Sequence, residues 1–265
     1  MKYKFTGETK IFFGIELKRI RATAVIEKYN VAVGDLGGWI EDEKNLDQSG
    51  DAWVSGNAQV SGNAQVCGNA RVSGNAQVSG NARVYGGAWV SGDAWVSGDA
   101  QVSGNAQVCG NTRVSGDARV SGDAQVSGNA WVFGNTQVSG NAWVSGDARV
   151  SGDAQVSGNA QVSGNAWVSG DAWEKSPLYI QGTKYAFYMA AANKVGCGCQ
   201  VFTFAGWHKF WRKIAAKFDM TEAEQAEYVS YFNLACERYG KLEFKIDLSD
   251  GSGDEEPCED TENEE

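Results

Sequence analysis

Residues 49–66 read SGDAWVSGNAQVSGNAQV, and this six-residue unit sets the fold of the chain. The unit S-G-[ND]-A-x-V recurs without insertion or deletion from Ser49 to Glu174, which makes 21 hexads in 126 residues. Twenty hexads end in valine, and 19 have alanine two positions earlier, with Thr112 and Thr136 as the exceptions. A repeat of this regularity predicts a solenoid, in which each coil packs only on its neighbours.

Each part of the hexad has a structural role. In Ala-x-Val, a short strand, alanine and valine point to one face and the variable residue x to the other. Valine suits a strand, and alanine fits a narrow interior. Ser-Gly-Asn/Asp supplies a turn, because glycine tolerates positive φ and Asn or Asp hydrogen-bonds its own backbone. Three such units close a coil of 18 residues, so the 21 hexads predict seven coils.

The pattern also resembles the hexapeptide repeat of left-handed β-helix proteins, in which an aliphatic residue recurs at every sixth position with a small residue two positions before it. The resemblance covers the whole repeat, residues 49–174. It implies an all-β solenoid in the form of a left-handed parallel β-helix. The handedness follows from the resemblance and not from the period.

The segments on either side of the repeat are expected to cap it, because open strand edges promote aggregation. Residues 1–48 are predicted to form an N-terminal β cap, with Ile20, Ala22, Ala24 and Ile26 alternating along a strand-rich region. The segment GDLGGWIE at 34–41 supplies a turn and an aromatic residue. We expect its Trp39 to lie over the first coil and close the apolar interior.

Residues 175–248 are predicted to form a small α+β domain that blocks the far end of the solenoid. Three segments, 177–181, 183–189 and 195–202, have the pattern of an antiparallel sheet. Thr203 is expected to cap a helix whose apolar side chains recur at helical spacing: Trp207, Phe210, Trp211, Ile214 and Phe218. A second helix should begin with the capping box Thr221-x-x-Glu224 and end at Gly240.

A closer resemblance combines the GDLGGWIE cap, the SGNAxV and SGDAxV hexads, and the motif G-C-x-C at 196–199 before Thr203-Phe204-x-x-Trp207. This combination, which spans residues 10 to about 240, is similar to proteins of unassigned function carried by tailed bacteriophages and bacteria. Some of them are labelled acyltransferases from the repeat alone. The resemblance implies a phage or prophage origin and brings no established activity.

The net charge of −10 is concentrated at the C-terminus. Residues 249–265 contain nine acidic residues and no basic one, so the rest of the chain carries a net charge of only −1. That segment has the composition of a disordered acidic tail. A nearly neutral body lacks the electrostatic footprint of a nucleic-acid-binding protein.

The sequence shows no apolar run near the ~20 residues that span a bilayer and no secretory signal pattern at its start. We therefore expect a cytoplasmic protein without a membrane partner, in the host cytoplasm if phage-encoded, with association with the virion left open. The six cysteines do not form a disulfide pattern, since Cys67 and Cys109 replace repeat serines and only Cys197 and Cys199 are clustered. Reduced thiols are expected.

Two enzyme families that have the left-handed β-helix resembled by this repeat use histidine. Hexapeptide acyltransferases use one as a general base near a loop that interrupts the coils, and γ-class carbonic anhydrases use three to bind zinc. Here no hexad contains a histidine, no loop interrupts the repeat, and the single histidine is His208. We therefore expect no catalytic, cofactor or metal site. An acyltransferase-like enzyme with a site at a subunit boundary that uses His208 is the main alternative.

The variable x positions sort into three columns if the coil has 18 residues. The first column reads Trp53, Arg71, Trp89, Gln107, Gln125, Trp143, Gln161. The second column reads Gln59, Gln77, Trp95, Arg113, Trp131, Arg149, Trp167. The third column reads Gln65, Arg83, Gln101, Arg119, Gln137, Gln155, Trp173.

Tryptophan and arginine alternate over five coils of the second column. Stacked in register, each guanidinium would lie beside an indole, in the geometry of a cation–π contact. Such ladders can simply stiffen a thin solenoid, but aromatic and arginine residues are also enriched in binding hot spots. The candidate binding residues are Trp95, Arg113, Trp131, Arg149 and Trp167, with Trp53, Arg71 and Trp89 of the first column. The candidate partners of this surface are a second copy of the chain, another protein or a glycan. Beside a binding or scaffold module and an acyltransferase-like enzyme, the third candidate function is that of a phage factor that inhibits a host defence protein or sequesters a signal molecule.

Overall fold

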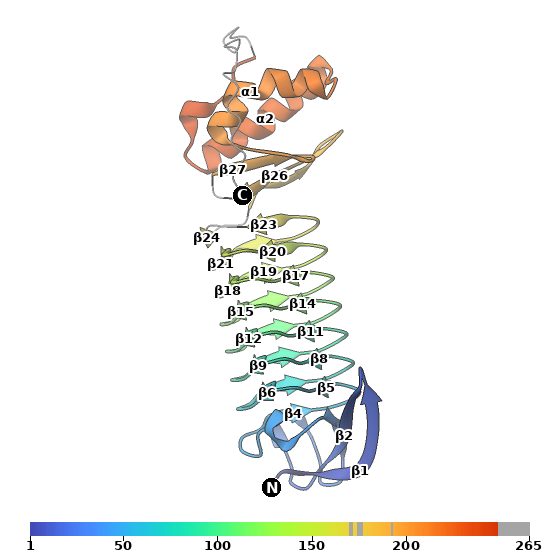
Figure 1. Cartoon of the computed structure of the whole chain (residues 1–265). Helices are drawn as coiled ribbons and strands as arrows, with labels where there is room; N and C mark the ends of the chain where they lie inside the picture. Colours follow the sequence, from blue (N-terminus) through green and yellow to red (C-terminus); the bar gives the residue numbers. More distant parts are fainter. Residues whose placement is uncertain (170–171, 174–176, 192, 249–265) are drawn as a thin grey trace. The chain divides into compact units, whose positions relative to one another are not determined.

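The computed structural model describes residues 1–169, 172–173, 177–191 and 193–248. The chain forms two compact units that divide between Pro177 and Leu178. The first unit contains the predicted cap and a parallel β-solenoid of about seven turns, and the second contains an antiparallel sheet and two helices (Figure 1). The structure therefore confirms the predicted solenoid class. The acidic segment 249–265 and the left-handed sense of the coil stay predictions, the former because it lies outside the described residues.

Every hexad contributes one short strand, and the strands stack into three parallel sheets. The first column lies on β4 (Trp53–Val54), β7 (Arg71–Val72), β10 (Trp89–Val90), β13 (Gln107–Val108), β16 (Gln125–Val126), β19 (Trp143–Val144) and β22 (Gln161–Val162). The second lies on β5 (Gln59–Val60), β8 (Gln77–Val78), β11 (Trp95–Val96), β14 (Arg113–Val114), β17 (Trp131–Val132), β20 (Arg149–Ser151) and β23 (Trp167–Ser169). The third lies on β6 (Gln65–Val66), β9 (Arg83–Val84), β12 (Gln101–Val102), β15 (Arg119–Val120), β18 (Gln137–Val138), β21 (Gln155–Val156) and β24 (Ala172–Trp173).

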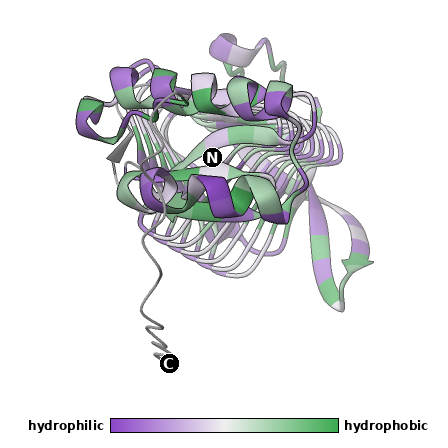
Figure 2. Ribbon diagram, turned by 90° about the horizontal axis from the view of Figure 1, so that it is seen from above, coloured by the Kyte–Doolittle hydropathy of each residue, from purple (hydrophilic) through white to green (hydrophobic). Residues whose placement is uncertain are grey.

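The interior of the solenoid is lined by the repeat alanines and valines, as the period predicts. From Val54 to Val168 every repeat valine is at most 1% exposed. The coils superimpose when seen along the stack (Figure 2), and backbone hydrogen bonds of 2.8–3.0 Å join each strand to the next coil. Because the core is thin, these continuous ladders hold the coils together.

The last strand of the third column is out of register. Gln155 and Val156 pair with Ala172 and Trp173, whereas the hexad period predicts Trp173 beside Gln155. The hexad that contains this strand is the one that ends in glutamate instead of valine.

Thr112 and Thr136, the two exceptions at the alanine position, are completely buried. Neither Oγ1 has a hydrogen-bond partner among the described residues. A buried hydroxyl without a partner lowers stability, because it loses its bonds to water and gains none in return.

We therefore expect Thr112→Val to raise the free energy of unfolding by about 1–2 kcal/mol, since valine keeps the shape and removes the hydroxyl. The measurement is a urea denaturation followed by circular dichroism. The substitution Gln107→Ala, at an exposed x position outside the Trp–Arg column, serves as the control and should change stability by less than about 0.5 kcal/mol. A destabilised valine variant would show that the hydroxyl has a favourable partner.

The N-terminal cap extends the sheet of the second column. Strands β1 (Tyr3–Phe12) and β2 (Ile15–Ala22) form an antiparallel hairpin, and β3 (Leu36–Ile40) joins β2 to β5. Two short 3-10 helices, η1 (Glu27–Tyr29) and η2 (Glu43–Asn45), complete it. Leu17, Ile20, Ile40 and Leu46 are fully buried and cover the first coil.

The predicted role of Trp39 as a lid over the interior is wrong. Trp39 pairs with Gln59, so it stands at an x position, outside the coil, while its neighbour Ile40 pairs with Val60 and faces inward. Its ring is contacted from outside by Lys10 and Arg19, at 4.5 and 5.3 Å from the ring centroid. The alternation of the strand thus makes the isoleucine, and not the tryptophan, the inward residue.

The glycines before Trp39 are required by close packing. A Cβ on Gly37 would lie 2.4 Å from Cγ1 of Ile20 and 2.8 Å from the carbonyl oxygen of Val54. A Cβ on Gly38 would lie 2.7 Å from the carbonyl oxygen of Ala58. The sequence GGW therefore marks the place where the cap backbone is pressed against the first coil.

The second unit has the predicted α+β content with one strand more. Its sheet consists of β25 (Tyr179–Gln181), β26 (Ala186–Ala191), β27 (Lys194–Cys197) and β28 (Gln200–Thr203), in that order. The segment predicted as a single strand, 195–202, is instead a hairpin, because Gly198 has a φ of 57° and turns the chain at the Gly-Cys pair. The expected helix, α1 (Phe204–Lys217), is capped by Thr203.

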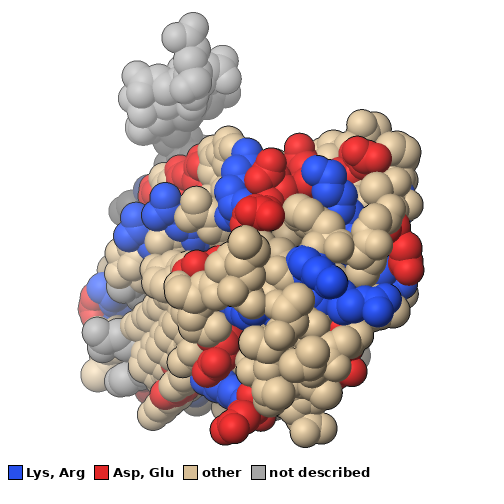
Figure 3. Space-filling model, turned by 90° about the horizontal axis from the view of Figure 1, so that it is seen from below, with Lys and Arg blue, Asp and Glu red and all other residues tan. Residues whose placement is uncertain are grey.

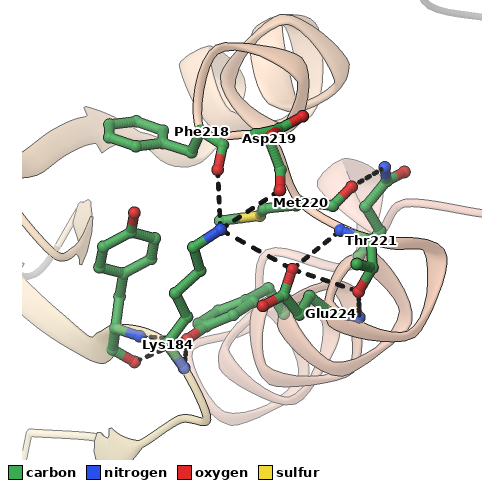
Figure 4. A network of polar contacts seen from close by, with 9 residues as sticks. Lys184, Phe218, Asp219, Met220, Thr221 and Glu224 are labelled. Atoms are coloured by element: carbon green, nitrogen blue, oxygen red, sulfur yellow. Dashed lines mark hydrogen bonds and ion pairs between the residues drawn. The ribbon is translucent and has the colours of Figure 1, made fainter.

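The second predicted helix is also present, as α2 (Glu222–Arg238), followed by the short η3 (Leu242–Phe244). The Thr221 and Glu224 capping box forms, and Gly240 has a φ of 67° after the helix. In Figure 4, the Nζ of Lys184 donates to the carbonyl oxygens of Phe218 and Asp219 at 2.9 and 3.2 Å, and lies 3.9 Å from Glu224. One lysine thus joins the end of α1 to the start of α2.

Among the described residues, no helix combines the length and the apolar composition needed to cross a membrane.

Candidate binding surface

The tryptophans and arginines of the second column are direct neighbours in the sheet. Trp95 pairs with Arg113, Arg113 with Trp131, Trp131 with Arg149, and Arg149 with Trp167. The backbone N–H groups of Trp95, Arg113 and Trp131 each donate to the following coil at 2.9 Å. A sheet spacing of about 4.8 Å therefore fixes the vertical positions of these five side chains.

The guanidinium groups lie over the indole rings. The guanidinium carbon of Arg113 is 5.8 Å from the ring centroid of Trp95 and 4.8 Å from that of Trp131. That of Arg149 is 5.2 Å from the ring of Trp131. Each contact contributes about 0.5–1 kcal/mol at an exposed site, so the column is ordered without being buried.

Serine hydroxyl groups orient the indoles. The Nε1–H of Trp95 donates to Ser79 at 3.5 Å, and that of Trp167 donates to Ser151 at 3.3 Å. Trp89 and Trp143 of the first column bond in the same way to the serine 16 residues earlier, at 3.2 and 3.3 Å. The rings consequently lean toward the preceding coil and leave one side in solvent: Trp95 and Trp131 are each 38% exposed, and Trp167 is 54% exposed.

Phe133 also belongs to this surface. It was not among the predicted binding residues, because it does not stand at an x position of the repeat. It replaces the serine that follows the strand of Trp131, and its ring is 36% exposed. The signal was present in the sequence, because the repeat serine position lies two residues after x and therefore faces outward like x.

The start of the first column does not form an open surface. Trp53, predicted to face solvent, is only 2% exposed. The cap segment around η1 lies on this part of the column, where the hydroxyl of Tyr29 bonds to the carbonyl oxygen of Asn69. The ring of Tyr29 lies 5.4 Å from the guanidinium of Arg71, which also contacts Trp89 at 5.4 Å. Burial raises the pKa of Tyr29, and the nearby Arg71 opposes that rise.

The repeat aspartates act in turns, stacked on asparagines. Asn75 donates to Asp93 at 2.9 Å and Asn129 donates to Asp147 at 2.9 Å, each one coil further along. The same contact occurs at Asp99, Asp123 and Asp153. A carboxylate accepts but cannot donate, so an aspartate naturally ends a run of stacked amides. These aspartates therefore belong to rows of hydrogen-bonded turn residues that connect successive coils.

The other candidate groups lie in the second unit. The Nδ1 of His208 is 3.0 Å from the carbonyl oxygen of Phe244, on an exposed part of α1. Cys197 is buried at the end of β27, and burial raises the pKa of its thiol to about 12, whereas Cys199 is exposed. The two cysteines therefore lie in different environments. Among the described residues, no three His, Cys, Asp or Glu side chains gather in a way that could hold a metal ion.

Charge is mixed on the face that Figure 3 shows. Basic and acidic side chains lie next to one another there, with a large neutral area between them. That distribution agrees with the near-neutral charge of the chain before residue 249.

The fold and the repeat define the class of this chain: it is a β-solenoid repeat protein. Its coils are similar to a known family of repeats, described as the YdcK beta solenoid repeat, over residues 64–76, 76–92, 106–122, 124–140, 136–152, 142–158, 154–170 and 160–175. A search of curated proteins found no match to the chain.

Proposed function

We propose that this protein is a non-catalytic binding or scaffold module that associates with a second copy of itself through the second column. The observation that supports this is the Trp–Arg ladder, in which five residues from Trp95 to Trp167 are held in register and three indoles remain 38–54% exposed. A row of tryptophans, the side chain most enriched in binding hot spots, is an unusual surface for a monomer. The resemblance to phage-carried proteins supports a phage origin.

A second copy fits the ladder because the ladder is complementary to itself. In an antiparallel dimer with its two-fold axis between Arg113 and Trp131, Arg113 faces Trp131 of the second copy and Trp95 faces Arg149. Every tryptophan in those four pairs meets an arginine. An isologous interface of this kind repeats each contact twice. The interface would also cover the exposed ring of Phe133, two residues after Trp131.

The test is the double substitution Trp95→Ala/Trp131→Ala, examined by sedimentation velocity across a range of concentrations. A hot-spot residue contributes about 2 kcal/mol or more, which corresponds to a roughly thirtyfold weaker Kd for each tryptophan. The matched control is Trp89→Ala/Trp143→Ala on the first column, where the exposures are 43% and 46%. It should leave association unchanged, and the unfolding midpoint of both variants is measured to show that they fold.

Two results would contradict the proposal. One is a wild-type protein that sediments as a monomer at concentrations of tens of micromolar. The other is an equal loss of association in both double variants, which would indicate a general effect of removing tryptophan. Binding of another protein or a glycan to the monomer would then be the remaining use of the surface.

The acyltransferase reading has less support from the site. Within the described residues, His208 lies on α1 in the second unit with its Nδ1 at a backbone carbonyl, and no other histidine exists in the sequence. Calorimetric titration with acetyl-CoA separates the two proposals, because saturable binding would favour an enzyme and its absence a binding module.

A further inference from the structure

The solvent-facing side of α1 carries four basic residues. Lys209, Arg212, Lys213 and Lys217 follow one another at helical spacing, and α1 contains no acidic residue. The opposite face is buried and is formed by Phe204, Trp207, Trp211, Ile214 and Ala215. The packing of the second unit therefore leaves the three lysines of this basic stripe exposed, while Arg212 is half-buried.

The stripe lowers the stability of its own helix. Lys209, Lys213 and Lys217 are spaced i, i+4 and i+8, so each faces a like charge one turn away. Like charges at this spacing destabilise a helix by about 0.2–0.5 kcal/mol per pair. Within the described part of the chain, none of these three lysines makes an ion pair, while lysines elsewhere in the same unit do, Lys184 with Glu224 and Lys245 with Glu237.

The segment that follows the second unit carries the opposite charge. Residues 249–265 contain nine carboxylates and no base. The chain passes α1 shortly before this segment, because the carbonyl oxygen of Phe244 at the end of η3 is 3.0 Å from Nδ1 of His208. It then runs along α2, where the backbone of Ile246 bonds to the side chain of Asn233. Only four residues separate Phe244 from the acidic segment. Seventeen residues can extend to about 55–60 Å, whereas a helix of 14 residues is about 21 Å long.

We propose that the acidic segment 249–265 binds the basic stripe of α1 in the same molecule and shields it from other polyanions. Since the segment is tethered within a few residues of the stripe, its effective concentration is in the millimolar range, which exceeds that of a free competitor. The attraction is electrostatic and between exposed groups, so it weakens as salt is added. The positive charges of the stripe are thereby neutralised by acidic residues of the same chain.

The first test uses the full-length protein and a water-soluble carbodiimide, which joins a carboxylate and an amine that are in contact. At low salt, peptide mass spectrometry should find amide crosslinks from residues 249–265 to Lys209, Lys213 or Lys217, and these should disappear at about 0.5 M salt. A mixture of isotope-labelled and unlabelled protein shows whether both ends belong to one molecule. Absence of these crosslinks, or crosslinks only between molecules, would overturn the proposal.

The second test measures the salt concentration at which the protein elutes from immobilised heparin. Changing the nine carboxylates of 249–265 to their amides should uncover the stripe and raise the elution salt. Adding Lys209→Gln/Lys213→Gln/Lys217→Gln should reverse that gain. The matched control adds Lys4→Gln/Lys28→Gln/Lys194→Gln, three exposed lysines elsewhere, with the same change of charge. If both triple substitutions lower the elution salt equally, the segment acts through net charge alone and the proposal fails.

Discussion

Replacing Gly128 with alanine is expected to lower the free energy of unfolding by about 3 kcal/mol or more. The φ of Gly128 is +72°, a left-handed conformation that costs an L-residue about 1–2 kcal/mol. A Cβ at this position would also lie 2.8 Å from both the backbone nitrogen and the carbonyl oxygen of Gly146 in the next coil. Backbone atoms inside a continuous ladder cannot rotate away, so the clash adds an overpacking cost of about 1–3 kcal/mol.

The control separates the conformation from the clash. Gly14 has a φ of +80° in the N-terminal hairpin, and a Cβ there would have no atom within 4 Å. Gly14→Ala should therefore cost only the conformational part, about 1–2 kcal/mol. Urea denaturation of the two variants and the wild type gives the comparison. Equal losses would mean that the turn glycines are needed for their φ alone and that neighbouring coils can move apart.

Replacing Val126 with aspartate is expected to destabilise the solenoid by about 3–5 kcal/mol at neutral pH, enough to unfold it or make it aggregate. Val126 is fully buried between Val108 and Val144 of the neighbouring coils, where a carboxylate would meet only apolar groups. Its neighbour Gln125 is exposed on the same strand. Gln125→Asp should therefore change the stability by less than about 0.5 kcal/mol.

The pH dependence provides a second readout of the same pair. Burial favours the neutral acid, so the pKa of the introduced aspartate would be raised in the folded state above its value in the unfolded chain. The folded state then binds more protons than the unfolded state, and the stability of Val126→Asp should rise as the pH falls through that raised pKa. Thermal unfolding between pH 4 and 8 measures this. Similar profiles for the two variants would mean that valine and glutamine do not face opposite sides.

The repeat predicted the solenoid well because its local and long-range signals coincide. Except at the last strand of the third column, a residue of the repeat and its neighbour in the next coil are 18 positions apart, so the pairs Trp95–Arg113 and Arg113–Trp131 follow from counting alone. The same holds for the inward valines and for the turns that carry Asn75 and Asp93. Nothing beyond the period and the alternation of a strand was needed.

Predictions from the sequence failed where the period ends or where an unrelated segment meets the repeat. Trp39 was expected to cover the interior, but the alternation of β3 gives that place to Ile40. Trp53 was expected in solvent, but it is buried where the cap segment around Tyr29 lies on the first column. The hairpin of β27 and β28 was read as one strand, because a single Gly-Cys turn is a weak signal.

The sequence by itself thus determined the number of coils, the three columns and, up to Val168, the side of the strand on which each repeat residue stands, since translation by 18 residues repeats one local geometry. Only the tertiary structure decided which x residues are open to solvent and how the cap closes the first coil. Those features depend on contacts between segments that share no repeat, and no spacing along the chain specifies such contacts.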